Sequence, residues 1–577
     1  MKRMLKYLPP VLLLPAALRA QTPPPAEGPG FGVMTHFAQG WDRSWISAVA
    51  EASIPYIRDE LYWDEIEPAK GKYVFPEKYD RYMADLRTKG ISPLIVLSFE
   101  NKNYDRGFTP YTDDAFSAYA RYGVEVLRHY GDQIKAVEIW NEYNGTFCKG
   151  PATQDRAGTY LQMLRVAYTA IKRARPDVVV AGGATSGVPR PYWKELLAGG
   201  GLAWMDVLSI HPYRYDAPPE GLEDEIAALQ NLVKKYNGGR TKPVWVTEIG
   251  WGTKPSAAPG DLAIDEATQA KFLVRAYALL FSAGVERVYW YLLHDYNDLS
   301  MGLLRDDGRH AAKPAYLALA TMIRQLRGAR FVRREPAADG FYSLVFVRPS
   351  GEETRVVWSL KPMAVAIGRE AKVVDLRGQD LETDGHLQVD DSPVFVTGPL
   401  TGLPPPSAAN DVILADSAKG FSAQQGANGW SYGMFIGDST RFFPLSRYTV
   451  TDWTQAWTDK YPYLSLTATD QHPSQDGSTP VAVVRRWESD FSGTVRIAGQ
   501  FRCDTQGDGV GASVLIDGRR RFRKMLGGGT NPIVASFDFS QAVHRGTLID
   551  FAVDPGPTVN INYDATAVSV TIQKEAQ

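Results

Sequence analysis

Between residues 31 and 326, eight short apolar runs rich in β-branched residues alternate with longer segments in which apolar residues recur with helical period. This alternation is typical of repeated strand–helix units over a parallel sheet. Eight units in roughly 300 residues predict an α/β fold, the closed (β/α)8 TIM barrel. The strand candidates are residues 31–36, 56–60, 93–98, 136–142, 178–184, 206–211, 244–249 and 287–293. The helix candidates include residues 113–130, 156–174, 222–236 and 266–283.

The helical period stops after Leu326, and only short alternating runs follow. Residues 327–400 therefore predict a small β domain packed on the barrel. Residues 401–410 include three consecutive prolines and predict a stiff, extended linker. Residues 411–577 contain strand-like runs between Gly- and Asp-containing turns, which predict a C-terminal β-sandwich.

The N-terminus has the order of a secretory signal peptide. Three basic residues within the first six precede an apolar run over residues 8–18 and a small residue, Ala20. We therefore expect a signal peptide over residues 1–20, a Pro- and Gly-rich tether over residues 21–30, and a secreted or periplasmic protein without an integral membrane span. An uncleaved anchor is the alternative, because Arg19 departs from the small residues that cleavage prefers.

Charge and cysteine usage exclude several classes of partner. The chain carries 63 Lys and Arg against 65 Asp and Glu, so no global field attracts nucleic acid or an anionic membrane. Its two cysteines, Cys148 and Cys503, lack the spacing of a zinc or redox site. The histidines lack metal-ligand spacing and no phosphate loop precedes a helix, so we expect neither metal nor cofactor. The sequence indicates no oligomeric state.

Two predicted barrel strands end in a glutamate. The fourth ends at Glu142 and the seventh at Glu248, where barrel enzymes build their active sites. A glycosidic bond is cleaved by one carboxylic acid that protonates the leaving oxygen and a second carboxylate at the anomeric centre. A salt-bridged strand end is the alternative for either glutamate alone, but the two together favour a glycosidase.

The sequence around these glutamates resembles a known family. The run Trp-Asn-Glu at 140–142, with Thr-Glu-Ile-Gly-Trp at 247–251, resembles the catalytic signature of clan A retaining glycoside hydrolases, most nearly the family 39 group. Arg58 and the segment 63–73 are similar to the run that follows the second strand in these enzymes. The resemblance covers about residues 31–326.

The resemblance implies a role for each residue. Glu142 would be the acid/base, Glu248 the nucleophile, and Asn141 a donor to the sugar hydroxyl next to the anomeric carbon. The two carboxyl groups would lie about 5–5.5 Å apart, as retention requires. Tyr143 and Asn144 stand where many relatives have Pro-Asn, which changes the loop rather than the chemistry.

The acid must stay protonated and the nucleophile ionised. Burial and the charge of Glu248 are expected to raise the pKa of Glu142. Arg58 and Tyr213 are the donors expected to hold Glu248 ionised. His211 is either a substrate contact or a loop anchor.

Other polar and aromatic residues fall at predicted strand ends. Trp290, at the end of the eighth strand, predicts a platform for a sugar ring, with a core position as the alternative. His36 after the first strand, and Glu100 and Asn101 after the third, are candidates for the subsites.

The β-sandwich contains six residues that make it a possible carbohydrate-binding module: Trp430, Tyr432, Trp453, Trp457, Tyr461 and Tyr463. A buried core is the alternative for each. Four aspartates, Asp504, Asp508, Asp554 and Asp564, are candidates for a structural calcium site.

The sequence therefore predicts an exported retaining glycoside hydrolase that cleaves a β-linked glycan or an exopolysaccharide, with an oligo- or polysaccharide as partner. A transglycosylase using the same residues is one alternative. A catalytically silent glycan-binding protein is the other.

Overall fold

The computed structural model describes residues 28–575 except 216, 255–262, 298, 339, 405–412, 452–453, 504–507 and 529–532. The predicted signal peptide, most of the tether and most of the linker lie outside the described residues. No helix among the described residues is long and apolar enough to cross a membrane.

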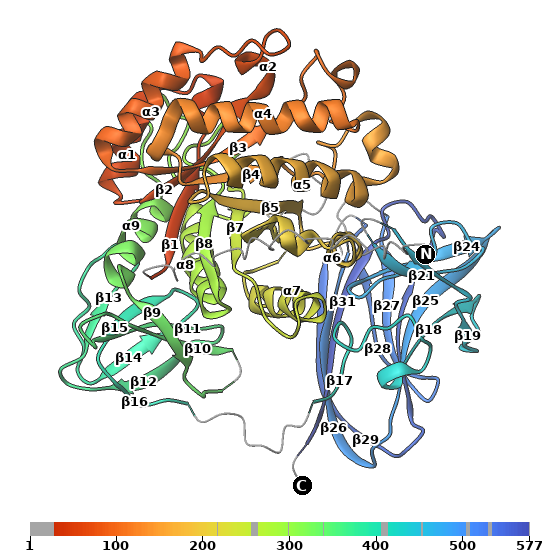
Figure 1. The fold of residues 1–577 in the computed structure, drawn as a ribbon. Helices are drawn as coiled ribbons and strands as arrows, with labels where there is room; N and C mark the ends of the chain where they lie inside the picture. Colours follow the sequence, from red (N-terminus) through yellow and green to blue (C-terminus); the bar gives the residue numbers. More distant parts are fainter. Residues whose placement is uncertain are drawn as a thin grey trace, which may run out of the picture.

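Eight parallel strands close into a barrel, in which each strand pairs with the next along the chain and β8 pairs with β1 (Figure 1). This confirms the predicted TIM barrel. The strands are β1 (Gly30–Met34), β2 (Tyr56–Tyr62), β3 (Ser92–Ser98), β4 (Ala136–Ile139), β5 (Val179–Ser186), β6 (Val207–His211), β7 (Val244–Ile249) and β8 (Val285–Trp290).

Helices surround the barrel and bury one apolar face each against it (Figure 1). Several begin at a side chain that caps the first turn: Thr112 before α4, Asp155 before α5 and Asp265 before α8 each accept a bond from a backbone N–H three residues on. The helices are α1 (Ile46–Glu51), α2 (Trp63–Ile66), α3 (Glu77–Lys89), α4 (Asp113–Tyr130), α5 (Arg156–Ala174), α6 (Arg190–Ala198), α7 (Leu222–Tyr236), α8 (Glu266–Ser282) and α9 (Pro314–Leu326).

The fourth strand ends earlier than the apolar run predicts. β4 stops at Ile139, because Trp140 and Glu142 have φ angles of 66° and 43° and leave the extended conformation. The backbone N–H of Glu142 donates to the carbonyl oxygen of Ala184 at the end of β5, 2.7 Å away. Glu142 therefore stands on a turn fixed to the neighbouring strand.

After α9 the chain forms a small antiparallel β unit of one five-stranded and one three-stranded sheet. It packs on the barrel: Tyr342 and Trp358 share the core of the barrel, and the Trp358 Nε1–H donates to Glu220 at 3.0 Å. The strands are β9 (Arg330–Arg334), β10 (Phe341–Val347), β11 (Glu353–Ser359), β12 (Met363–Ile367), β13 (Lys372–Val374), β14 (His386–Val389), β15 (Val394–Thr397) and β16 (Leu400–Gly402). β16 pairs with β12, so the first two residues of the predicted linker, Thr401 and Gly402, belong to this unit.

The C-terminal region is a sandwich of an eight-stranded and a seven-stranded antiparallel sheet around its own apolar core (Figure 1). Its strands are β17 (Ile413–Asp416), β18 (Trp430–Ile436), β19 (Phe443–Pro444), β20 (Arg447–Val450), β21 (Gln455–Thr458), β22 (Ser465–Leu466), β23 (Asp470–His472), β24 (Ser474–Asp476), β25 (Thr479–Glu488), β26 (Gly493–Cys503), β27 (Val510–Ile516), β28 (Arg519–Leu526), β29 (Val534–Val543), β30 (Leu548–Asp554) and β31 (Thr566–Lys574).

Most of the sandwich aromatics singled out in the sequence are core residues. Trp430, Tyr432 and Trp457 are buried between the two sheets, and Tyr461 packs against the same core. Tyr463 is 71% exposed. Trp453 lies outside the described residues.

Candidate active site

One buried cation organises the interior of the barrel mouth. The guanidinium of Arg58 on β2 donates from Nε to Glu138, from Nη1 to Glu248 and from Nη2 to the Asn141 side-chain oxygen, at 2.6, 2.6 and 2.8 Å. Arg58 is only 1% exposed. Burial lowers the pKa of Arg58, but the charges of Glu138 and Glu248 outweigh it and raise the pKa overall.

Glu248 at the end of β7 is held by two donors. Arg58 binds its Oε1, and the Tyr213 hydroxyl donates to its Oε2 at 2.8 Å. Burial, followed by the charge of Glu248, raises the pKa of Tyr213 well above its usual value, so this hydroxyl keeps its proton. Both bonds stabilise the ionised carboxylate, which is the state that a nucleophile needs.

Glu142 faces Glu248 across His211. The His211 Nδ1 lies 3.0 Å from Oε1 of Glu142 and 3.7 Å from Oε2 of Glu248. One oxygen of each glutamate and one ring nitrogen of His211 lie within 4.8 Å of one another. This short spacing agrees with the close carboxyl pair of retaining enzymes rather than with the wider pair, about 6.5–9.5 Å apart, of inverting enzymes.

The pKa of Glu142 runs against the sequence-based expectation. Burial raises it, but the hydrogen bond and charge of His211, together with the charge of Arg58, lower it overall. Burial lowers the pKa of His211, yet the charge of Glu248 and the bond to Glu142 raise it overall. Glu142 and His211 therefore titrate as one hydrogen-bonded pair, and Glu142 is not an isolated carboxyl group.

A second layer of polar side chains supports these groups. Glu138, buried inside β4, accepts bonds from Arg58 and from the Ser209 hydroxyl. The Thr247 hydroxyl lies 2.5 Å from that of Ser209 and 3.0 Å from Nε2 of His211. Sequence reasoning missed Glu138, although a charged residue in the middle of an apolar barrel strand is itself a signal.

Comparisons with known proteins bear on this arrangement. No family model matches the chain, and no curated protein matches it. A family 39 glycoside hydrolase from the gut symbiont Bacteroides cellulosilyticus WH2 is 25% identical, with a TM-score of 0.55 over 65% of this chain and 81% of that chain. A family 39 β-xylosidase from Caulobacter crescentus is 17% identical, with a TM-score of 0.48 over 66% of this chain and 98% of that chain.

The sequence motifs around Glu142 and Glu248 resemble those of the group to which the Bacteroides enzyme belongs. The chain is a retaining glycoside hydrolase. Its barrel resembles that of the family 39 enzyme. The substrates named for individual solved relatives belong to those proteins.

At the end of β8 in this hydrolase, the aromatic side chain that faces the barrel mouth is not the predicted Trp290 but the next residue. Trp290 is fully buried, and its Nε1–H donates to the carbonyl oxygen of Met301 at 2.8 Å, so it offers no face to a sugar. Successive side chains of a strand point to opposite sides, and the next residue faces the mouth instead. Tyr291 is half-buried, with ring centroids 6.3 Å from Tyr213 and 6.1 Å from His36. A platform at this strand end is therefore Tyr291.

The remaining candidates lie around the mouth but do not touch the two glutamates. The Nδ1 of His36 lies 3.1 Å from Glu60 on β2. Burial lowers the pKa of His36, but the charge and hydrogen bond of Glu60 raise it overall. Asn101 donates to backbone carbonyl groups of Trp63 and Glu67, so it anchors a loop. Glu100 lies 3.2 Å from the ammonium of Lys149.

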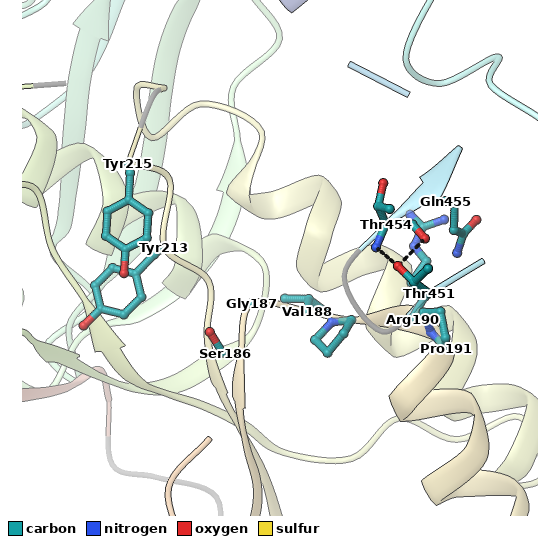
Figure 2. A pocket seen from close by; sticks show the side chains of 11 residues that line it. Ser186, Gly187, Val188, Arg190, Pro191, Tyr213, Tyr215, Thr451, Thr454 and Gln455 are labelled. Atoms are coloured by element: carbon teal, nitrogen blue, oxygen red, sulfur yellow. Dashed lines mark hydrogen bonds between the residues drawn. The ribbon is translucent and has the colours of Figure 1, made fainter. Parts of the chain in front are cut away.

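A pocket of about 430 Å³ lies between the barrel and the sandwich, and neither Glu142 nor Glu248 lines it. Its barrel side is formed by Tyr213, the donor to Glu248, by Tyr215 and by residues 186–191. The far side is Thr451, Thr454 and Gln455, beside the turn between β20 and β21 (Figure 2). The sandwich therefore supplies one wall of the pocket.

The cluster of Glu142, Glu248 and His211 also has the spacing of three metal ligands. Its donor atoms are already engaged, because Arg58 and Tyr213 bind both oxygens of Glu248 and His211 binds Glu142. A divalent cation there would have to replace the guanidinium of Arg58, which is buried beneath the site. The residues of this cluster therefore do not fit a metal ion.

Chelation should leave turnover unchanged for this reason. We expect kcat and KM on a soluble aryl glycoside to stay within about twofold after treatment with EDTA, because two carboxylates suffice for the reaction. A loss of turnover that a divalent ion restores would contradict this reading of the cluster.

Proposed function

We propose that the chain is an exported enzyme that cleaves a β-linked glycan or an exopolysaccharide by double displacement through a glycosyl-enzyme. The observation that carries the proposal is the facing pair of glutamates: Arg58 and Tyr213 donate to Glu248, and His211 lies within hydrogen-bond distance of Glu142. One carboxyl group can act as the nucleophile and the other as the acid/base.

In the first step, a carboxylate oxygen of Glu248 attacks the anomeric carbon as the glycosidic C–O bond breaks. Glu142 gives its proton to the departing oxygen, so the aglycone leaves as an alcohol. The side-chain oxygen of Asn141 accepts from Arg58, which leaves the Nδ2 hydrogens to donate to the neighbouring sugar hydroxyl. A bond of this kind that strengthens as charge develops lowers the barrier.

In the second step, Glu142 takes a proton from water, and the resulting oxygen attacks the same carbon. The ester to Glu248 breaks, and the product keeps the original configuration. Arg58 and Tyr213 then stabilise the carboxylate that leaves.

The pocket between barrel and sandwich supports a substrate of several sugars. It is lined by Tyr213, whose hydroxyl binds Glu248, and by Gln455 of the sandwich, while neither catalytic glutamate lines it, so it would hold further sugar units rather than the reacting ring. The stacked rings of Tyr213 and Tyr215, 4.9 Å apart and 10° from parallel, add an aromatic surface of the kind that sugars pack against.

Export rests on the N-terminal sequence. The basic residues, the apolar run over 8–18 and Ala20 follow the order of a signal peptide. An exported location suits a substrate that is itself a cell-surface or extracellular polymer. The N-terminal sequence of the mature protein, recovered from the periplasm or medium, tests this location.

Two glutamate substitutions test the roles. On an aryl glycoside with a good leaving group, Glu142→Ala should slow deglycosylation by about 100- to 10,000-fold, and azide should restore turnover with a β-azide product. Glu248→Ala should abolish formation of the glycosyl-enzyme, as seen by intact-protein mass spectrometry with a slow fluoro-sugar substrate.

Glu65→Ala is the matched control, since Glu65 is a half-buried glutamate on α2 paired with Lys78 and is not a candidate for the substrate site. It should keep near wild-type turnover. If Glu142→Ala and Glu248→Ala both behaved like this control, the assignment would be wrong. A panel of β-linked polysaccharides with product sizing then identifies the substrate and shows whether attack is endo or exo.

We infer that Glu142 and His211 share the proton of the acid, and this predicts a pH effect. The Glu142–His211 pair gives up its last proton only above the raised pKa of His211, so the acid is available near neutrality. In His211→Asn, Glu142 must hold the proton alone against the charge of Arg58. The alkaline limb of kcat/KM should then move to lower pH for substrates with poor leaving groups. Tyr213→Phe, which contacts Glu248 rather than Glu142, should leave that limb in place; equal shifts in both variants would exclude the shared proton.

Removal of the sandwich tests its part in binding polymers. A chain ending at Ser407 keeps β16 and all the catalytic residues, so kcat/KM on an aryl monoglycoside should change little. Cleavage of long polymer should fall at least about tenfold, because one wall of the pocket and any tethered binding site are lost. Equal losses on small and long substrates in a folded truncated chain would contradict this division of roles.

A further inference from the structure

Two aspartates meet at one end of the β-sandwich from different sheets. Asp508 lies just before β27 in the seven-stranded sheet, and Asp564 just before β31 in the eight-stranded sheet. Asp554, the last residue of β30, pairs in register with Gly511 of β27 and lies beside them. Both loops therefore carry a carboxylate to the gap between the sheets.

Among the residues that the structure describes, neither Asp508 nor Asp564 has a hydrogen-bond partner for its carboxylate. Asp564 is only 1% exposed, and neither of its side-chain oxygens accepts a hydrogen bond. Both side-chain oxygens of Asp508 are also buried and unpartnered. A buried carboxylate without hydrogen bonds or an opposite charge costs several kcal/mol, so an isolated pair needs a compensating group.

The neighbouring charges disfavour ionisation of the Asp508 and Asp564 carboxyl groups. Burial, followed by the charges of Asp508 and Asp554, raises the pKa of Asp564 to about 7. Arg523 and the Gly556 N–H bind the two oxygens of Asp554, at 2.7 and 3.1 Å. In the described part of the chain, no Lys or Arg forms an ion pair with Asp508 or Asp564.

The backbone holds the pair in place. Gly528 has a φ of 63°, and a side chain there would come within 2.0 Å of the carbonyl oxygen of Asp508. A Cβ on Gly556 would likewise lie only 2.4 Å from the carbonyl oxygen of Gly509. Because these glycines let the main chain pack so closely, the backbone that carries Asp508 cannot move away without losing this packing.

We propose that Asp508 and Asp564 bind a calcium ion that joins the two sheets of the sandwich. The donors that this pair offers are carboxylate oxygens, which suit a hard cation rather than zinc. Calcium takes six to eight oxygen ligands in flexible geometry, so two aspartates can be completed by backbone carbonyl groups and water. Asp554, already bound by Arg523, contributes negative charge nearby and is not a ligand. Asp504 lies outside the described residues and is not part of the site.

The test uses the full chain. After treatment with EDTA and dialysis, calcium is titrated by calorimetry while the melting transition of the sandwich is followed. We expect one bound calcium per chain and a rise in Tm of about 5 °C at a hundredfold excess over Kd, because the ion binds the folded state alone. Turnover on a soluble aryl glycoside should not change, which separates this site from the catalytic glutamates.

The variants Asp564→Asn and Asp508→Asn should each lose the calcium response. Without calcium, Asp564→Asn should melt at a higher temperature than wild type at pH 8, because it removes a charge from an unpaired buried site. Asp538→Asn, in an exposed ion pair with Arg496 on the same domain, is the control and should keep the response.

Calcium binding and the response of Tm to calcium decide whether the site exists. Absence of binding up to about 10 mM calcium, or an unchanged Tm response in both asparagine variants, would overturn it. If the variants do not fold, the stoichiometry of calcium on the wild-type chain decides.

Discussion

The architecture of the mouth depends on a single guanidinium in a place where water cannot reach it. Arg58 is 1% exposed inside a closed barrel, so its charge must be balanced by groups that the barrel itself supplies. Glu138 and Glu248 provide that balance, and Asn141 takes the remaining donor. Arg58 on β2 thereby sets the orientation of both Glu248 on β7 and Asn141 after β4. Pre-organisation of this kind is what lets a static site stabilise a developing positive centre.

Periodicity in the sequence was enough to predict the barrel, because buried parallel strands and amphipathic helices leave separate signatures in the order of apolar residues. The bounds of α4, α5 and α7 agree with the predicted segments to the residue. Strand ends could not be predicted as well. β4 stops short of Glu142 because two residues adopt positive φ, a choice that depends on contacts with β5 rather than on local pattern. The first residues of the Pro-rich segment join β16 through pairing with a distant strand.

In the site, too, local sequence motifs predicted which residues take part but not the contacts that those residues make. Motifs placed Glu142, Glu248, Arg58 and Tyr213, because their spacing follows the strand ends. What the motifs could not give is the state of each group: His211 lies 69 residues from Glu142 in sequence yet 3.0 Å away in space, and it reverses the expected direction of the pKa shift. Trp290 and Tyr291 differ by one position on a strand end, and only the direction of the side chain decides which meets the substrate.

The backbone at the acid/base Glu142 is held in an unfavourable conformation. Trp140 and Glu142 are non-glycine residues in the left-handed region, a conformation that costs about 1–3 kcal/mol each. They are kept there by the Tyr119 hydroxyl, which binds the Trp140 N–H from α4, and by Ala184 on β5. Trp140 is itself fully buried in the apolar core of the barrel. The same core that stabilises the fold therefore also holds the acid/base in its strained conformation, so core substitutions beside Trp140 would misplace Glu142 as well as destabilise the barrel.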